Sequence, residues 1–447
     1  MTISIPPAVL RCLAALEAAG YSANIVGGCV RDSLMGRVPH DWDVCTCALP
    51  DEVARVFEAG RIIPTGIKHG TLTLLDGDMS IEITTLRRDG DYLDHRRPVG
   101  VSFTGDLRED LARRDFTVNA MAFHPERGLC DPFGGEGDIG ARVLRCVGEP
   151  ERRFSEDALR ILRLFRFASQ LSFAPHEETL AAAGRCVKLL GAVSSERVAA
   201  ELDRLLVGQN VYESLRLAAK SGVLGEILPE FIPAFDFDQR TPYHNRKLDD
   251  HIFYAIAAAP ADLTVRLALL FHDLGKPDVF YTDETGRGHF KGHVCPSALY
   301  ARAIMQRLRY PARLSARVEL LVAEHNRKIP VVPKAMRRLA SAFGTDFIFE
   351  LINLKEADDR AKTPIKNTRA LRYARAREIL DKIIAGGDCL TLEHLAVGGN
   401  DLIALGIPSG PALGKALDNL LDLVLDEPDR NTREFLLAQA KLEAGAP

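Results

Sequence analysis

The sequence lacks any apolar run that is long enough to cross a membrane. No stretch of about 18 consecutive apolar residues occurs in the chain of 447 residues. The opening segment, MTISIPPAVLRCLAALEAAG, also lacks the basic region, apolar core and cleavage site of a secretory signal. We therefore expect a soluble cytoplasmic protein with no membrane partner.

Paired cysteine patterns are also absent. The nine cysteines are scattered, and only Cys45 and Cys47 lie close together. Such spacing predicts neither a zinc site nor a disulfide framework, so we expect reduced thiols that are mostly buried. Internal repeats and low-complexity linkers are missing as well, which means that the sequence does not mark domain boundaries sharply.

What the chain does contain is enough hydrophobic sequence for a large core. Hydrophobic residues make up 47% of it, and its length favours about three domains. Residues 71–86, TLTLLDGDMSIEITTL, predict two strands around a tight turn. From about residue 155 onward, apolar residues recur at intervals of three and four, which is typical of helices. The sequence therefore predicts an α+β fold in which a β-containing head precedes an all-helical remainder.

Helix starts are expected where serines precede acidic residues, namely at Ser155 and at Ser194 or Ser195. Residues 155–167, SEDALRILRLFRF, predict one amphipathic helix with Asp157 and Arg160 as surface neighbours. Its arginines are expected opposite an apolar stripe, which consists of Ala158, Ile161, Leu162 and Phe165.

The formal net charge of -4 hides two basic runs in the second half of the chain. Residues 302–338 hold ten Lys or Arg against two Glu, and residues 360–377 hold seven basic residues and no acid. Single runs of this kind are most often solvated helix faces. Two of them in one half of an acidic protein favour a polyanionic partner such as the phosphate backbone of a nucleic acid.

A glycine pair lies near the N-terminus, in the segment NIVGGCVRDSLMGR. NIVGG predicts a strand that runs into a tight turn, and a helix is expected to open directly after it. The bare N–H groups of a helix start and a neighbouring arginine suit a phosphate group. Gly27, Gly28 and Arg31 are therefore candidates for holding a triphosphate.

Two carboxylates follow in the segment HDWDVCT. The strand period of two places Asp41 and Asp43 on one face, where they repel unless a cation lies between them. Mg²⁺ prefers one or two carboxylates together with phosphate oxygens. A lone D-x-D is more often a polar turn, but the GGCVRD segment upstream favours a metal site for phosphoryl or nucleotidyl transfer.

The segment GGCVRDSLMGRVPHDWDVCT (27–46) resembles the signature of polymerase-β-type nucleotidyltransferases, within the class II family of CCA-adding enzymes and bacterial poly(A) polymerases. The similarity continues through residues 84–123, 131–135 and 156–167 and, less specifically, to the end of the chain. The resemblance implies a polymerase-β-like head of mixed β-sheet and helices, followed by a helical neck, an HD-like body and a tail.

The same resemblance implies domain limits and site residues. The head would span 1–142, the neck with base recognition 143–212, the body 213–340, and the tRNA-binding tail 341–447. Asp41 and Asp43 would be the catalytic carboxylates that bind Mg²⁺, with Glu82 left open as a third ligand. Nucleotide contacts are implied for Gly28, Arg31, Arg114, Asp157, Arg160, Arg163 and Arg166.

Within that set, Asp157 and Arg160 would match the Watson–Crick edge of CTP or ATP, with Glu156 orienting the arginine. Asp115 would help to shape the site beside Arg114. The segment Arg87–Arg97, RRDGDYLDHRR, would be the loop that favours A addition.

Three later segments, LDDHIFYAI, LLFHDLGKPDVF and HFKGHVCPSA, resemble the HD phosphohydrolase pattern. His251, His272, Asp273 and His293 fit this pattern, and His325 is an additional candidate. Imidazole and carboxylate together suit a second divalent metal of the transition series. The usual late aspartate of the pattern is not evident, so the sequence leaves open whether this site binds metal or is only structural.

These residues together favour a CCA-adding tRNA nucleotidyltransferase that uses CTP, ATP and Mg²⁺ and holds the acceptor and T arms of tRNA with its basic helices. Addition of A alone, or poly(A) synthesis, is the nearest alternative. An HD phosphohydrolase, or an RNA-binding protein without catalysis, are alternatives of other classes. The sequence does not indicate the oligomeric state.

Overall fold

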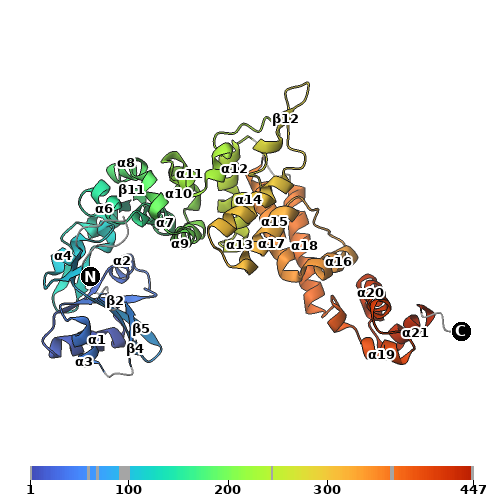
Figure 1. Ribbon diagram of the computed structural model, residues 1–447, viewed down its shortest axis with the longest axis horizontal. Helices are drawn as coiled ribbons and strands as arrows, with labels where there is room; N and C mark the ends of the chain where they lie inside the picture. The colour runs from blue at the N-terminus through green and yellow to red at the C-terminus, as the bar shows by residue number, and fades with distance from the viewer. Residues whose placement is uncertain are drawn as a thin grey trace. The chain divides into compact units, whose positions relative to one another are not determined.

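The computed structural model describes residues 3–57, 61–66, 70–89, 101–242, 245–362 and 367–443. The chain divides into two compact units, Met1–Ile232 and Pro233–Pro447 (Figure 1). The finer division at residues 142, 212 and 340 stays a prediction. Within the described ranges, every helix is too short or too polar to span a bilayer.

The first unit contains a seven-stranded mixed sheet in the order β3-β4-β5-β2-β1-β8-β9. The central strands β2 and β5 are parallel, and the other neighbouring strands are antiparallel. The strands are β1 (Ala23–Val26), β2 (Trp42–Thr46), β3 (Ile62–Gly66), β4 (Thr71–Asp76), β5 (Met79–Thr85), β8 (Ala122–His124) and β9 (Gly128–Cys130). The predicted hairpin over residues 71–86 is confirmed by β4 and β5.

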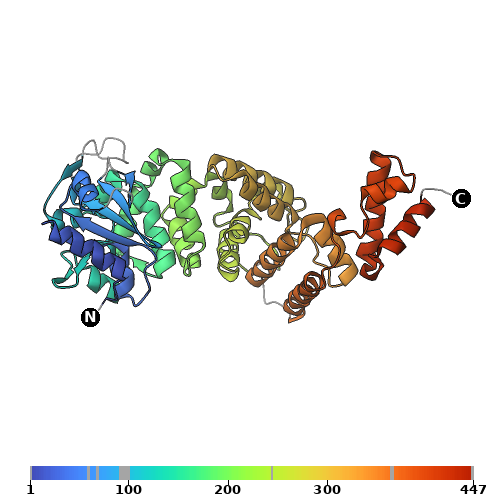
Figure 2. The same ribbon diagram turned by 90° about the horizontal axis from the view of Figure 1, so that it is seen from below.

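Alternation of side chains gives this sheet two apolar faces. Ile25 and Val44 point into one core, which contains residues of the helices α1 (Pro7–Ala18) and α3 (Pro50–Val56). Val26 and Cys45, one position further along each strand, lie in a second core with Leu111. Figure 2 shows α1 in dark blue, lying across the strands of the sheet. Apolar clusters therefore lie on both faces of the sheet, while Glu82 in the middle of β5 stays exposed.

Short helices and strands connect the sheet to the helical part of the first unit. Up to Glu156 they are α2 (Gly28–Leu34), β6 (Arg87–Asp89), β7 (Val101–Phe103), α4 (Leu107–Ala112), α5 (Gly135–Ala141), β10 (Val143–Leu144) and α6 (Pro150–Glu156). After α6 come α7 (Leu159–Leu171), β11 (Ala174–Pro175), α8 (Glu177–Arg185), α9 (Ser195–Leu206), α10 (Val211–Lys220) and α11 (Val223–Ile227).

The predicted helix start at Ser155 is wrong. Ser155 lies inside α6, which ends at Glu156. Asp157 has extended backbone angles, and the next helix, α7, begins at Leu159. The expected apolar stripe of α7 is buried, but Arg160 and Arg166 are buried too. Ser194 does cap α9 by position, although its hydroxyl makes no capping hydrogen bond.

The second unit is almost entirely helical, as the sequence periodicity predicts. Its helices are α12 (Leu248–Ala258), α13 (Leu263–Phe271), α14 (Val294–Arg307), α15 (Ala312–Glu324), α16 (Pro333–Phe343), α17 (Thr345–Ala361), α18 (Asn367–Ala385), α19 (Gly399–Ala404), α20 (Pro411–Asp426) and α21 (Arg433–Glu443). The short strands β12 (Tyr281–Thr282) and β13 (Gly288–His289) form a hairpin between α13 and α14. Helices α12 and α15 both contact the pair α13 and α17, which places the ends of four helices around one point.

All nine cysteines are free thiols, and five of them are buried. This burial agrees with the prediction that most of the cysteines are buried. Burial raises the pKa of Cys45 to about 12, so this thiol stays protonated and packs as an apolar group.

Candidate nucleotide site and metal cluster

The glycine turn after β1 brings the backbone of Gly27 close to Asp43 in strand β2. Gly27 has φ +82°, and a Cβ atom there would lie 2.8 Å from Arg114 Nη1 and 3.7 Å from Asp43 Oδ2. Only glycine meets both the backbone angle and the space. Helix α2 opens directly after this turn, as predicted, and its buried Arg31 donates to Asn119 Oδ1 at 2.6 Å.

Asp43 lies in β2 beside two further acids. Its register partner in the parallel strand β5 is Glu82, so both side chains leave the sheet on the same face. Asp41 is exposed just before the strand, while Trp42 between the two aspartates is buried. Burial, followed by the charges of Glu82 and Asp41, raises the pKa of Asp43 to about 6, although Arg114 opposes the shift. This accumulation of carboxylate charge fits a bound divalent cation.

Asp115 connects the sheet-containing part of the first unit to helix α7. It accepts from Arg163 Nη2 at 2.5 Å and from Asn119 Nδ2 at 3.1 Å. Burial alone would raise the pKa of Asp115, but Arg163 and the hydrogen bonds lower it well below its usual range. Asp115 is therefore a fixed negative charge that holds Arg163 in the site.

The predicted pair of Asp157 and Arg160 is arranged differently from the expectation. Arg160 donates to Glu156 Oε2 at 2.8 Å and to the carbonyls of Arg113 and Arg153. Asp157 instead pairs with Arg197 of α9 at 3.1 Å. The prediction that Asp157 and Arg160 are neighbours on one helix is wrong, because Asp157 lies between two helices and Arg160 lies in the second of them, α7. The idea that Glu156 orients Arg160 agrees with the contact observed here.

Arg166 is held by a buried ion pair and an aromatic ring. Its Nη1 lies 3.1 Å from Glu201 Oε1 of α9, and its guanidinium lies 4.0 Å from the centre of the Phe167 ring. Burial, and then the charge of Arg163, lower the pKa of Arg166 to about 10 despite Glu201. Phe167 also has Arg31 and Arg163 within 5.3 Å of its centre. The ring therefore lies close to three guanidinium groups.

Both predicted catalytic aspartates and all of the predicted nucleotide contacts line one cavity of about 580 Å³. Eight arginines and five aspartates face it, so the cavity has an excess of positive charge that suits a triphosphate. Its predicted lining residues are Gly28, Arg31, Asp41, Asp43, Arg114, Asp157, Arg160, Arg163 and Arg166. Glu82 is absent from this lining in the described part of the head.

Sequence reasoning missed Arg197, Glu201 and Phe167. Arg197 and Phe167 line the cavity, and Glu201 supports Arg166 from behind. A charged residue on an amphipathic helix gives no signal of which partner it will meet. Of the predicted loop at residues 87–97, only Arg87, Arg88 and Asp89 lie among the described residues.

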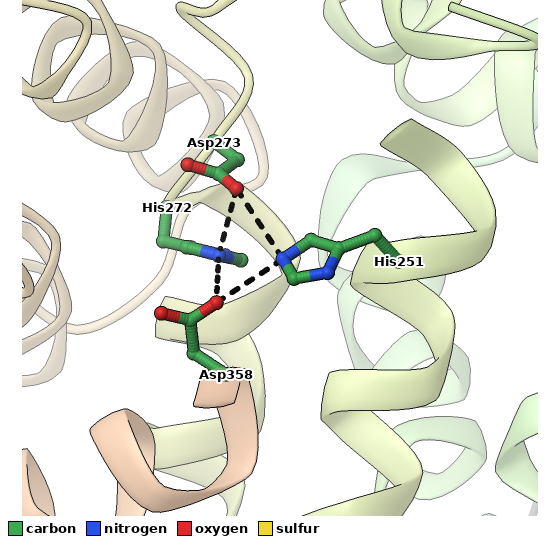
Figure 3. A group of neighbouring side chains, drawn as sticks. All are labelled: His251, His272, Asp273 and Asp358. Carbon is green, nitrogen blue, oxygen red and sulfur yellow. Dashed lines mark ion pairs between the residues drawn. The ribbon is translucent and has the colours of Figure 1, made fainter. Parts of the chain in front are cut away.

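A second cluster lies in the helical unit, where His251, His272, Asp273 and Asp358 converge (Figure 3). His251 Nε2 is 3.1 Å from Asp358 Oδ1 and 3.5 Å from Asp273 Oδ2. His272 Nε2 is 3.1 Å from Asp273 Oδ2 and 3.6 Å from Asp358 Oδ1. Asp358 supplies the late aspartate that the sequence did not reveal, from the run EADDR of α17.

This cluster fits a metal ion by an independent measure. His272 Nε2 and Asp358 Oδ1 are buried and have no hydrogen-bond partner among the residues that the structure describes. Burial lowers the pKa of His272, but Asp273 and Asp358 outweigh it and raise the value to about 9. The carboxylates thus favour a positive charge at this point, which either a proton or a metal ion can supply.

His293 and His325 lie on the other side of Asp273. A Cβ atom on Gly275 would lie 2.7 Å from the carbonyl oxygen of His293, so this glycine lets the start of α14 approach the HD turn. The ligand atoms of Asp273, His293 and His325 lie within 4.8 Å of one another. The sequence placed His293 with His251 and His272, whereas the structure groups it with Asp273 and His325.

Many side chains of the two basic runs are paired inside the second unit. Arg317, for example, donates to Glu350 at 2.6 Å, and Arg377 donates to Glu356 at 2.6 Å. Further pairs join Arg302 to Glu319, Arg327 to Glu324, Lys334 and Arg338 to Asp426, Arg337 to Asp388, Arg360 to Glu356, Lys362 to Asp358, Arg369 to Asp359, and Arg375 to Glu378. The runs therefore stabilise the helical unit as well as presenting charge.

Comparison with known families gives three matches along the chain. Residues 23–145 match the Poly A polymerase head domain. Residues 172–235 match the probable RNA and SrmB-binding site of polymerase A. Residues 246–385 match the HD domain.

Individual proteins give a consistent picture. The chain is 47% identical over 208 residues to the CCA-adding enzyme of Geobacillus kaustophilus, which covers 46% of this chain and 51% of that protein. It is 45% identical over 219 residues to the CCA-adding enzyme of Levilactobacillus brevis, which covers 49% and 54% respectively. The chain thus spans about half the length of the curated relatives it matches.

Solved structures match over nearly the whole chain. The Bacillus stearothermophilus CCA-adding enzyme in complex with CTP aligns with a TM-score of 0.75 and 28% identity, covering 98% of both chains. The Thermotoga maritima CCA-adding enzyme complexed with tRNA aligns with a TM-score of 0.58, covering 98% of this chain and 96% of that chain. At 20% identity the second match shows the fold alone.

The head sheet, its arginine-rich cavity and the helical HD unit define a nucleotidyltransferase fold with an appended HD domain. The chain belongs to the class II family of CCA-adding enzymes and poly(A) polymerases, in the form that carries an HD domain.

Proposed function

We propose that this protein is a CCA-adding tRNA nucleotidyltransferase, which adds C, C and A to the 3′ end of tRNA from CTP and ATP. The observation that carries the proposal is the convergence of both head aspartates and the predicted nucleotide contacts on one cavity. Similar proteins support the substrates, because the sequence relatives are CCA-adding enzymes and one CCA-adding enzyme of similar structure is in complex with CTP.

Asp41 and Asp43 would hold Mg²⁺, and the register pairing of Asp43 with Glu82 supports Glu82 as a third carboxylate there. The chemistry that a bound Mg²⁺ would supply there is a lower pKa for an attacking hydroxyl and neutralisation of charge on a leaving pyrophosphate. Arg114, which lies against the Gly27 turn beside Asp43, would bind the phosphates. Catalysis by these residues would consist mainly of positioning and charge neutralisation.

Base selection would depend on the arginines and acids at the start of α7. Arg160 is fixed by Glu156 and two backbone carbonyls, and Asp157 is fixed by Arg197. A fixed donor group and a fixed acceptor group can match the edge of a cytosine or an adenine without a nucleic-acid template. Arg163 and Arg166 would complete the nucleotide contacts from the same helix.

The tRNA acceptor and T arms would bind to the basic helices of the second unit. Recognition of double-stranded RNA relies on shape and on phosphate contacts, which need basic side chains but few base contacts. Many of these side chains are ion-paired within the protein, so we expect part of the contact to come from exposed residues such as Arg313.

The test is primer extension with Mg²⁺ on a tRNA transcript that ends at the discriminator base, with CTP, ATP or both. The proposal predicts two additions with CTP alone and three with both nucleotides. Asp43→Ala should abolish addition, whereas Asp78→Ala, an exposed aspartate in the turn of the β4–β5 hairpin, should not. Extension only of tRNA that already ends in CC would instead identify an A-adding enzyme. Long tails from ATP alone would identify a poly(A) polymerase.

The His/Asp cluster supports a second candidate function, a metal-dependent phosphohydrolase. A cavity beside the cluster is lined by Lys276, Arg287 and Lys362, which suits an anionic substrate. Hydrolysis of a phosphodiester that requires Mn²⁺ or Ni²⁺, is lost in His272→Ala and persists in Asp41→Ala would establish it. Absence of such hydrolysis with either metal would leave the cluster a structural role.

A further inference from the structure

Asp110 is a fully buried acid in contact with two arginines of the nucleotide cavity. It lies in α4, and the helix is anchored on both sides of it. Asp106 caps the start of α4 by accepting from the backbone N–H of Arg108 at 2.8 Å. Leu111 packs into the second core of the sheet. The backbone around Asp110 therefore fixes where its carboxylate lies.

This carboxylate holds the two arginines unequally. Its Oδ1 accepts from Nε and Nη2 of Arg113 at 2.9 Å and 2.6 Å, and from the backbone N–H of Arg87 at 3.3 Å. Its Oδ2 accepts from Nη2 of Arg114 at 3.3 Å. Burial raises the pKa of Asp110, but the charges of Arg113 and Arg114 outweigh it and lower the pKa below its ordinary value. Asp110 is therefore a fixed negative charge at neutral pH.

The contact with Asp110 leaves Arg114 able to bind an anion. A guanidinium has five N–H donors, and the bond to Asp110 uses one of them. Nη1 of Arg114 lies beside the turn, within 2.8 Å of the position that a Cβ atom on Gly27 would take. Its Nε is buried and has no hydrogen-bond partner in the described part of the chain. Because Arg113 and Arg114 share one carboxylate, Asp110 leaves one positive charge of the pair uncompensated.

The end of the same helix holds an arginine that we assign to base selection. The carbonyl of Arg113, directly after α4, accepts from Nη2 of Arg160 at 2.6 Å. The carbonyl of Ala112 accepts from Nη1 of Arg153 at 3.0 Å. Carbonyls at the end of a helix have no partner within the helix, so guanidinium donors satisfy them. One short helix therefore positions both Arg114 and Arg160.

We propose that Asp110 is a positioning residue for nucleotide addition, which holds Arg114 where the phosphates of CTP or ATP bind and steadies the helix end that holds Arg160. Asp110 acts through these arginines and does not touch the nucleotide. The inference rests on the proposed function and adds a residue outside the cavity lining. A carboxylate near a triphosphate repels it, so any contribution of Asp110 to binding comes from geometry and not from charge.

The test measures the Kd of the full chain for pyrophosphate and for CTP, with Mg²⁺, by isothermal titration calorimetry. Asp110→Asn removes a negative charge beside the cavity, so charge alone would tighten the binding of pyrophosphate. Positioning predicts the opposite, a Kd raised about tenfold or more for both ligands. Asp110→Glu keeps the charge but moves the carboxylate by one methylene group, so its Kd values should rise as well.

Two further variants separate positioning from general damage. Asp106→Asn is the matched control, because it removes the same charge from the exposed start of α4 and asparagine also caps helices. Its Kd values should equal those of the wild type. Arg114→Met combined with Asp110→Asn should bind pyrophosphate no more weakly than Arg114→Met alone, because Asp110 acts through Arg114. Loss of folded protein lowers the number of sites in the titration and leaves the Kd unchanged.

Unchanged or tighter binding of pyrophosphate by Asp110→Asn, or a further loss of affinity in the double variant, would overturn the proposal. If Asp110→Asn does not fold, Asp110→Glu decides in its place, and a wild-type Kd there would overturn it. These Kd values are measured without tRNA, so failure of the wild-type chain to extend tRNA would refute the proposed function without deciding the role of Asp110. A wild-type chain that binds neither ligand would overturn both.

Discussion

Truncation of the Glu201 side chain should lower the free energy of unfolding of the first unit more than truncation of an exposed charged residue does. Glu201 is 4% exposed and Arg166 is 6% exposed, and they are joined by one contact of 3.1 Å. Breaking a buried ion pair by truncating one partner costs about 3–5 kcal/mol, because the other charge stays buried. The Arg166 guanidinium keeps the Phe167 ring at 4.0 Å, so we expect the lower end, about 3 kcal/mol, for Glu201→Ala.

The single tryptophan of the chain makes this measurable for the first unit alone. Trp42 is 4% exposed in β2, so its fluorescence changes when the head core unfolds. With a slope of about 2–3 kcal/mol per molar urea, a loss of about 3 kcal/mol lowers the urea midpoint by about 1–1.5 M. Nucleotide affinity should fall with stability because Arg166 loses its fixed position.

Two further variants make the test decisive. Arg204→Met is the control, because Arg204 is 59% exposed and lies 4.0 Å from the same carboxylate, so its urea midpoint should match the wild type. Arg166→Met combined with Glu201→Leu should recover much of the loss, since apolar residues of similar size replace buried pairs well. A Glu201→Ala midpoint equal to that of Arg204→Met would refute the reasoning.

Three other changes test how the cavity is built. Gly27→Ala forces a Cβ atom to within 2.8 Å of Arg114 at φ +82°, so steady-state kinetics should show kcat/KM reduced by about 100-fold or more, equivalent to about 3 kcal/mol. Arg197→Met releases the Asp157 carboxylate, so selection of CTP and ATP over GTP and UTP, measured by competition, should weaken while unfolding by urea changes little. Phe167→Leu removes the aromatic ring that lies close to three guanidinium groups, so the KM for both nucleotides should rise. Phe167→Tyr keeps an aromatic ring and should have the wild-type KM. An unchanged KM in Phe167→Leu would exclude a role for the ring in holding the arginines.

The parts of the head that follow from local chemistry could be predicted from the sequence. The turn at Gly27 and the burial of Trp42 and Val44 on the face opposite Asp43 depend on φ preferences and strand period, which act over a few residues. The roles of the arginines came from family resemblance and not from periodicity. The helix pattern of residues 155–167 could not show a break, because Asp157 is held by Arg197 from another helix.

Long-range packing also hid Asp358, the fourth residue of the His/Asp cluster. Asp358 lies in an acidic helical run, EADDR, whose pattern is that of a solvated surface. Only the contact of α17 with α12 and α13 buries it beside His251 and His272. The basic runs carry the same lesson, because a sequence shows that Arg317 is charged but not that Glu350 of another helix pairs with it.

Three arginines that line the cavity of the first unit are held in place by other side chains of the protein. Arg31 is held by Asn119, Arg160 by Glu156, and Arg163 by Asp115. Fixing a free arginine side chain costs about 1.5–2 kcal/mol of conformational entropy. That loss is incurred when the chain folds, so an incoming triphosphate meets donors that need not be immobilised again.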